Sequence, residues 1–263
     1  MRESIQSLES TIRAALRLES ERCESTPSGF EFRNGRCNTS PRLAYGRHRG
    51  PASDVARQAA VLIALYPSTD NDEIWVTLTR RPMTLSHHAG QVCLPGGRIE
   101  HGESAVEAAI REFKEELGVA PPSADPLGKM NPTYVFASDN VVTPIVVAGE
   151  APATPWKPDP VEVDEVIEMP LTTVLPECSG VDRSDIGGPG GNPAEAMLPT
   201  AGWRLGKHAG ISDCGEAIDY RFRYPAIAFT DASGHRREIW GATAMILERF
   251  GRLFIRAKEE ANI

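Results

Sequence analysis

Several features that would place a chain in a specialised class are missing from this sequence. Its 263 residues contain no run of about 18 apolar residues, so no membrane span is expected. The N-terminus lacks the apolar core of a secretory signal, and its glutamates argue against a transit peptide. The five cysteines are an odd number without metal-ligand spacing, so no disulfide framework is expected. A reducing cytoplasm is therefore the simplest expected location.

Basic residues are also in the minority. Lys and Arg total 28 against 36 Asp and Glu, which gives a formal net charge of −8 at pH 7. A general nucleic-acid binder would show a basic stripe, so no nucleic-acid partner is expected. A polyanionic substrate would have to be bound by local arginines, lysines and metal ions, because the field of the whole protein does not attract it.

The periodicity of apolar residues predicts an α/β fold with a mixed sheet between helices. Residues 20–54 are polar, and residues 177–217 are rich in glycine and proline, so both are expected to lie outside the core. The chain then divides into an N-terminal helix with a polar arm (1–54) and one domain (55–263) that carries the 177–217 insertion. Helices are expected at 5–16, from 104 onward, at 171–175 and at 241–261, and strands at 59–66, 73–80, 141–149, 165–170, 220–229 and 238–240.

The most informative stretch is GRIEHGESAVEAAIREFKEELGV, residues 97–119. Ser104 and Glu107 have the spacing of a capping box, so a helix should begin there. Apolar residues then recur at i, i+4, i+7 and i+11, which places them on one stripe of that helix. These residues are Val106, Ile110, Phe113 and Leu117.

Three glutamates, Glu112, Glu115 and Glu116, fall on the other side of this helix within about one turn. Their carboxylates repel one another at neutral pH, and a helix that accepts this usually has a cation to offset it. Hard carboxylate oxygens suit Mg²⁺ or Mn²⁺. Arg111 lies four residues before Glu115 and is expected to hold one carboxylate in place. The alternative is a solvated acidic face with an ordinary Arg–Glu pair, which the nearby glycines and Glu103 argue against.

The same stretch resembles the signature box of the Nudix hydrolases, G-x5-E-x7-R-E-U-x-E-E-x-G-U with U apolar, and every specified position is filled. The resemblance implies a Nudix-type α/β/α sandwich and metal-dependent hydrolysis of a nucleoside diphosphate linked to another moiety. It implies that Gly96 adds a backbone carbonyl to the metal shell and that Glu103 either ligates or braces the helix. The expected catalytic residues are Glu103, Arg111, Glu112, Glu115 and Glu116, and the expected metal ligands are Glu112, Glu115, Glu116 and Gly96.

Upstream, residues 78–97 resemble the extra motif of the coenzyme A pyrophosphatase branch of that family. The matching positions are Leu78, Thr79, Arg81, Gly90, Pro95, Gly96 and Gly97. The expected substrate contacts are Arg81, His88, Gln91 and Gly97. A surface role remains the alternative for Arg81, and His88 has the alternatives of holding the loop or being solvated.

Four positions depart from the branch motif: Thr77, Pro82, Ser86 and Leu94. Ser86 matters most, because the motif has an arginine there and a guanidinium can bind phosphate bidentately. Either His87, Arg80 or Arg98 substitutes for it, or the substrate preference has drifted.

The branch implies coenzyme A or its derivatives as substrate, with 3′,5′-ADP and 4′-phosphopantetheine as products. ADP-ribose, NADH or another nucleotide are alternative substrates. A non-catalytic nucleotide-binding regulator is an alternative of another class, but such a protein would be expected to have lost carboxylates that are all present here.

Asp164 and Glu165 are candidates for a general base outside the box, and Cys93 is expected to be a small buried side chain rather than a nucleophile. The sequence leaves a monomer and a homodimer both open.

Overall fold

The computed structural model describes residues 5–24, 55–68, 73–85, 88–135, 138–175, 201–211 and 217–261. Ser86, His87, most of the polar arm and most of the glycine- and proline-rich insertion lie outside these residues. Among the helices described, none is long and apolar enough to cross a membrane.

Strand β1 (Arg57–Pro67) is the centre of an eight-stranded sheet. It pairs in parallel with β7 (Asn140–Ala148) and antiparallel with β2 (Ile74–Arg80) and β4 (Gly96–Arg98). The sheet is therefore mixed, as the sequence predicts. Its remaining strands are β3 (Val92–Cys93) and β8 (Glu165–Pro170) on β2, and β5 (Gly128–Lys129) and β6 (Thr133–Val135) on β7.

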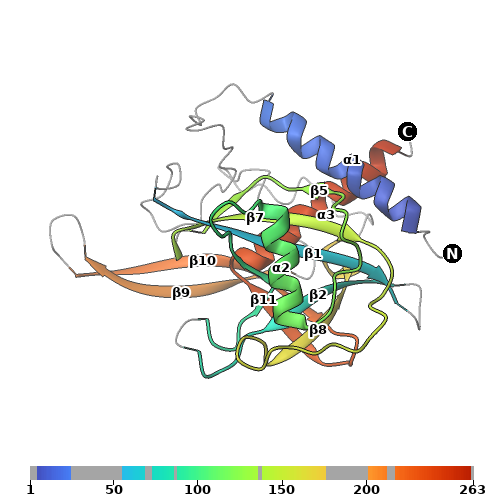
Figure 1. The fold of residues 1–263 in the computed structure, drawn as a ribbon. Coiled ribbons are helices and arrows are strands. Elements are labelled where there is room, and N and C mark those ends of the chain that lie inside the picture. Colours follow the sequence, from blue (N-terminus) through green and yellow to red (C-terminus); the bar gives the residue numbers. More distant parts are fainter. Residues whose placement is uncertain are drawn as a thin grey trace.

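Helices cover both faces of this sheet, because β1 buries side chains on both of its sides. Alternate residues of a strand point to opposite faces. Ala60, Leu62 and Ala64 face α2 (Ala105–Leu117), whereas Ile63 and Leu65 face α1 (Ile5–Glu24) and α3 (Ala242–Ala261). Figure 1 shows α2 on one side of the sheet and α3 on the other. This arrangement confirms the predicted α/β/α sandwich.

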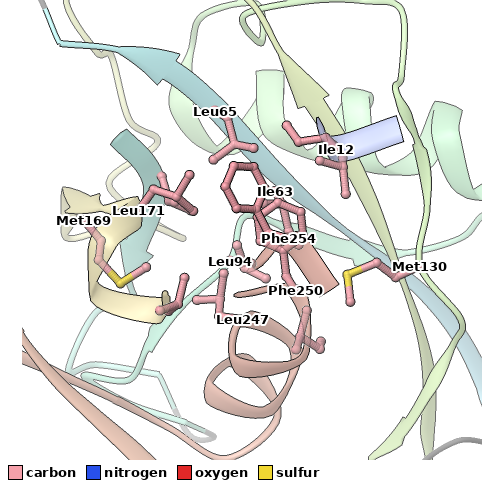
Figure 2. Packing of buried hydrophobic residues seen from close by; sticks show 14 of the residues in the cluster. Ile12, Ile63, Leu65, Leu94, Met130, Met169, Leu171, Leu247, Phe250 and Phe254 are labelled. Carbon is pink, nitrogen blue, oxygen red and sulfur yellow. The ribbon is translucent and has the colours of Figure 1, made fainter. Parts of the chain in front are cut away.

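The larger of the two cores lies between the sheet and the terminal helices (Figure 2). Phe250 and Phe254 of α3 pack beside Ile63 and Leu65 of β1, and Ile12 of α1 reaches the same cluster. The short 3₁₀ helix η2 (Leu171–Val174) adds its buried leucine and valine. The N-terminal helix, which the sequence-based division assigned to a separate segment, thus shares its core with the sheet.

A buried ion pair also joins the two terminal helices. Arg249 of α3 places its Nε 3.1 Å from Oε1 of Glu19 on α1. The Asn131 backbone N–H donates to the other carboxylate oxygen of Glu19 at 2.9 Å, so both oxygens have partners. Burial raises the pKa of Glu19, and the charge of Arg249 opposes that change.

A second, three-stranded antiparallel sheet has the order β11-β10-β9. Its strands are β9 (Ala201–Ile211), β10 (Ala217–Thr230) and β11 (Arg236–Trp240). The prediction that residues 177–217 lack regular structure is therefore wrong for residues 201–211. These residues pair along their whole length with the next strand in the chain, β10, and this cross-strand pairing outweighs the composition of the segment.

Candidate functional site

Helix α2 begins where the sequence predicts, and it ends at a glycine cap. The Ser104 Oγ accepts from the Glu107 backbone N–H at 3.2 Å, and the Glu107 carboxylate accepts from the Ser104 N–H at 2.8 Å, which completes the capping box. At the other end Gly118 adopts a left-handed conformation with φ 66°, and its N–H donates to the Lys114 carbonyl. These two caps fix the length and position of the acidic helix.

The buried face of α2 differs in part from the predicted stripe. Phe113 and Leu117 are fully buried and Val106 packs at the edge of the same cluster, but Ile110 lies outside it. Two alanines, Ala108 and Ala109, take the central places instead. The small alanine side chains let the helix approach β1 closely. The stripe of α2 residues that faces β1 is therefore rotated around the helix relative to the predicted stripe.

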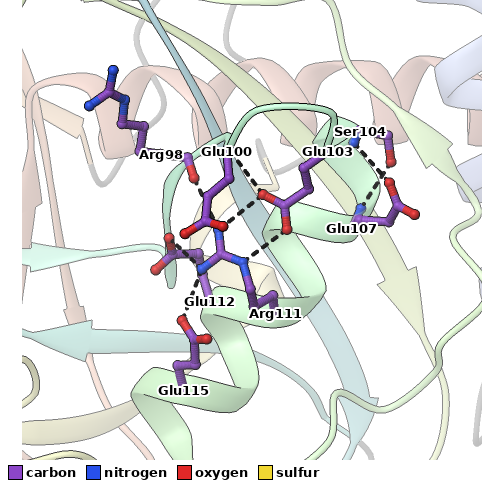
Figure 3. A network of polar contacts seen from close by, with 8 residues as sticks. All are labelled: Arg98, Glu100, Glu103, Ser104, Glu107, Arg111, Glu112 and Glu115. Carbon is purple, nitrogen blue, oxygen red and sulfur yellow. Dashed lines mark hydrogen bonds and ion pairs between the residues drawn. The ribbon is translucent and has the colours of Figure 1, made fainter.

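Arg111 connects three carboxylates of the acidic stretch (Figure 3). Its Nε and Nη2 donate to the two oxygens of Glu103 at 2.9 and 3.0 Å. Its Nη1 donates to Glu112 at 3.0 Å and to Glu115 at 2.9 Å, and Nη2 also donates to the Arg98 carbonyl. Glu103 therefore braces the helix through Arg111, which is one of its two expected roles.

Two of the predicted metal ligands meet a third carboxylate from another loop. Glu112, Glu116 and Glu162 each place one oxygen so that the three oxygens lie within 4.8 Å of one another. Glu116 is only 5% exposed, and Oε2 of Glu116 accepts from the Gly96 N–H at 3.3 Å. We call these three residues the carboxylate cluster.

The negative charge of the carboxylate cluster is only partly offset by the nearby arginines. Burial, with the nearby charge of Glu112, raises the pKa of Glu116 to about 8. Burial also raises the pKa of Glu112, although Arg111 opposes the effect. A divalent cation would relieve this repulsion, and an all-carboxylate donor set is the kind that Mg²⁺ and Mn²⁺ prefer. The residues present thus fit such an ion.

The glycine pair before α2 is required by close contacts. A Cβ on Gly97 would lie 2.5 Å from the Glu112 carboxylate, and a Cβ on Gly96 would lie 2.3 Å from the Ala60 carbonyl oxygen. Gly96 also has φ 147°, which favours glycine. The backbone of β4 can therefore lie directly against the carboxylate cluster. The predicted metal contact of the Gly96 carbonyl stays a prediction.

Glu162 is the functional residue that the sequence interpretation missed. It belongs to the acidic run VEVDEV (161–166), which leads into β8 and also contains the predicted candidate bases Asp164 and Glu165. Arg80 binds Asp164, with Nε 2.9 Å from Oδ2, and Arg237 binds Glu165 through Nη1 at 2.9 Å. The acidic run is the sequence signal for this residue. Nothing in its local sequence distinguishes Glu162, which faces α2, from the other acidic residues.

A family model for the NUDIX domain matches residues 56–184, a range that contains α2. The chain is therefore similar to the NUDIX domain over just under half of its length. It is 37% identical over 137 residues to "Nudix hydrolase 22, chloroplastic" of Arabidopsis thaliana, covering 51% of this chain and 44% of that protein. It is 39% identical over 120 residues to the uncharacterized Nudix hydrolase NudL of Salmonella newport (strain SL254), covering 45% of this chain and 60% of that protein.

Among solved structures, the MutT protein from Methanosarcina mazei Go1 is similar at 27% identity, with a TM-score of 0.36 over 47% of this chain and 84% of that chain. A score this low carries no argument about the fold, which rests on the sheet order and the two helical layers. Helices α1 and α3 and strands β9–β11 lie outside the residues that match the NUDIX domain.

The remaining Nudix-box glutamate, Glu115, does not join the carboxylate cluster. Its side chain is 57% exposed and is bound to Arg111. Helix geometry explains the difference, because Glu112 and Glu116 are one turn apart, whereas Glu115 is displaced around the helix toward solvent. Its expected role as a metal ligand remains a prediction.

Of the expected substrate contacts, Arg81 and Gly97 lie nearest to the Nudix carboxylates. The positive charge of Arg81 acts against the raised pKa of Glu116, and the Arg81 Nε is buried without a hydrogen-bond partner among the described residues. His88 is exposed, with a positive φ of 57°. Gln91 is half-buried. Arg81 is thus the guanidinium best placed to meet an anion.

Cys93 is half-buried rather than fully buried, and it has the properties of an unreactive thiol rather than a nucleophile. Its Sγ lies 3.4 Å from the Thr79 Oγ1, and burial raises the pKa of the thiol to about 11. The thiolate is the nucleophilic form, so a thiol with a raised pKa is unreactive at neutral pH. This agrees with the expectation from the sequence.

A cavity of about 1270 Å³ lies at the far end of β1 from the Nudix carboxylates. Its lining includes Tyr66, Trp75, Trp156 and Glu168, and no residue of α2 contributes to it. Gly96 and Gly97 pair instead with the first half of β1. The cavity is therefore separate from the carboxylate cluster.

Proposed function

We propose that this chain is a divalent-cation-dependent hydrolase that cleaves the pyrophosphate of a nucleoside diphosphate linked to another moiety. The observation that carries the proposal is the convergence of Glu112, Glu116 and Glu162 within 4.8 Å beside the glycine pair. The NUDIX-domain match over residues 56–184 supports it. All box carboxylates are present, which disfavours a non-catalytic regulator.

Each residue of the site has a separate task in this mechanism. Glu112, Glu116 and Glu162 would hold Mg²⁺ or Mn²⁺, and Arg111 would keep Glu112 in orientation through its 3.0 Å hydrogen bond. The bound cation offsets pyrophosphate charge and lowers the pKa of a water. Arg81 would neutralise the charge that develops on the phosphoryl oxygens, which is an electrostatic task.

Coenzyme A or a derivative is the substrate we favour, cleaved to 3′,5′-ADP and 4′-phosphopantetheine. Support comes from the branch motif at residues 78–97 and from the position of Arg81. Of the three substitutes for the arginine missing at Ser86, Arg80 is occupied by Asp164 and Glu165. Arg98 is exposed, and its guanidinium points away from Arg111 (Figure 3), so it is the better candidate for an extra phosphate. The cysteine pattern supports a cytoplasmic location.

A substrate panel with Mg²⁺ and Mn²⁺ in parallel tests the proposal. The panel contains coenzyme A, an acyl-coenzyme A, ADP-ribose and NADH, and the products are identified by mass. We expect metal-dependent formation of 3′,5′-ADP and 4′-phosphopantetheine, abolished by a chelator. A higher kcat/KM for ADP-ribose or NADH would transfer the proposal to that substrate. No metal-dependent cleavage of any member would favour the regulator.

The contrast between Glu162 and Glu115 yields a second test of the site. Both are exposed glutamates, so E162Q and E115Q remove the same charge, but only Glu162 lies in the carboxylate cluster. We expect E162Q to weaken Mn²⁺ binding by about tenfold or more and E115Q by no more than about threefold. Calorimetric titration of Mn²⁺ without substrate measures both values. The opposite order would assign the third ligand to Glu115.

A further inference from the structure

The loop that carries Glu162 is bound to both α2 and the sheet. We call residues 156–164 the strap. At its start, Trp156 packs edge-on against Phe113 of α2, with ring centroids 6.2 Å apart. At its end, the Asp164 N–H donates to the Arg80 carbonyl at 2.8 Å, and Val163 is buried. The strap thus spans from the acidic helix to the end of β2.

Backbone hydrogen bonds join the strap to the last carbonyls of α2. The Lys157 N–H donates to the Leu117 carbonyl, and the Asp159 N–H donates to the Glu116 carbonyl, both at 3.0 Å. The final carbonyls of a helix have no partner within the helix, so these bonds satisfy groups that would otherwise need water. The second bond ends on the same residue whose carboxylate belongs to the cluster.

Asp159 also closes the turn that presents Glu162. Its carbonyl accepts from the Glu162 N–H at 3.1 Å and from the Val163 N–H at 2.8 Å. Its side-chain Oδ1 accepts from the Val161 N–H at 2.9 Å. Asp159 therefore fixes the backbone on both sides of the turn, and its carboxylate supplies the side-chain acceptor that holds the turn.

We propose that Asp159 is a positioning residue that sets the distance of Glu162 from Glu112 and Glu116. The inference rests on the proposed cation-dependent function. Asp159 acts through backbone hydrogen bonds, because its own carboxylate lies outside the carboxylate cluster. Loss of its Oδ1 acceptor frees the Val161 N–H, and Glu162 then loses its fixed approach to α2. The charge of Asp159 has no part in this role.

Three variants separate the hydrogen bond from the charge. Asp159→Ala removes both, whereas Asp159→Asn keeps an Oδ1 acceptor and removes the charge. Asp159→Ser offers a shorter acceptor that can close a similar turn. Asp125→Ala is the matched control, because Asp125 is an exposed loop aspartate whose hydrogen bonds to Ser123 use only its backbone. Mn²⁺ affinity without substrate, thermal midpoint in chelator, and the split between kcat and KM are measured for each.

We expect Asp159→Ala to weaken Mn²⁺ binding by about tenfold and to lower kcat more than it changes KM, as loss of an outer-shell contact does. Asp159→Asn should bind Mn²⁺ within about threefold of the natural protein, and Asp125→Ala should be unchanged. Equal Mn²⁺ affinity in Asp159→Ala and the natural protein would overturn the inference, as would an equal loss in Asp159→Asn.

The experiment also distinguishes this inference from the proposed function. Absence of Mn²⁺ binding or turnover in the natural protein would remove the function itself. Normal binding in the natural protein with no effect of Asp159→Ala would remove only the positioning role. If Asp159→Ala does not fold, recovery of Mn²⁺ affinity in Asp159→Asn and Asp159→Ser still supports the hydrogen bond, and a loss in both contradicts it.

Discussion

Glu116→Gln is expected to reduce turnover by a factor of about 10³ or more, equivalent to roughly 4 kcal/mol of transition-state stabilisation. Glu116 is the most buried member of the carboxylate cluster, and its exposed fraction of 5% leaves no room for another group to replace it. Glutamine keeps the shape and the acceptor oxygen for the Gly96 N–H but supplies no negative charge. Full activity in Glu116→Gln would remove the metal assignment.

The same substitution should leave the metal-free fold intact or make it more stable. The pKa of Glu116 is about 8 in the folded chain against an ordinary value of 4.5, so the native state binds a proton that the unfolded chain has released. Stability of the metal-free protein therefore falls as pH rises from about 4.5 to about 8. Glu116→Gln should not lose stability over this pH range. Unfolding of both proteins in chelator at pH 6 and pH 9 would measure the difference. Glu100→Gln, an exposed glutamate outside the carboxylate cluster, is the matched control.

Gly118→Ala is expected to have the largest effect on folding, about 2–4 kcal/mol of the free energy of unfolding. Gly118 has φ 66°, and a Cβ there would lie 2.2 Å from the Lys157 carbonyl oxygen. That oxygen belongs to the strap backbone, so relief of the clash must move the strap away from α2. Urea unfolding measures the stability, and a loss of Mn²⁺ affinity should accompany it because Glu162 lies on the strap.

Gly102→Ala distinguishes the stability cost of backbone strain from the cost of a steric clash. Gly102 also has a positive φ of 83°, but a Cβ there would meet nothing within 4 Å. We expect its cost to be about 1 kcal/mol, from backbone strain alone. An equal loss of unfolding free energy in Gly118→Ala and Gly102→Ala would mean that the strap is not in close contact with the end of α2. The proposed link between α2 and Glu162 would then be weakened.

Features that depend on neighbouring residues could be predicted from the sequence. The capping box of Ser104 and Glu107 lies within a single short segment, and its interactions form locally. The central strand also follows from its own apolar residues at 59–66. These predictions are confirmed because the physical causes lie within one helix or one strand.

Features that depend on distant residues could not be predicted. Glu162 reaches Glu116 only because the strap binds the end of α2, and no pattern in the strap sequence indicates which acidic residue faces the helix. Side-chain direction is a second limit: Glu112 and Glu115 both belong to the Nudix box, but the position of Glu115 on the helix directs its side chain toward solvent.

The buried contact between Glu19 and Arg249 bears on how the molecule is made. Because α1 precedes the eight-stranded sheet in the chain and α3 follows it, there is an interval in synthesis when Glu19 and the strands exist without Arg249. During that interval Ile63 and Leu65 have no α3 to shield them, although the acidic helix has already been synthesised. Nascent chains of this protein therefore pass through a stage in which the apolar face of the sheet that α3 covers is exposed. Chaperones can bind this surface during that stage.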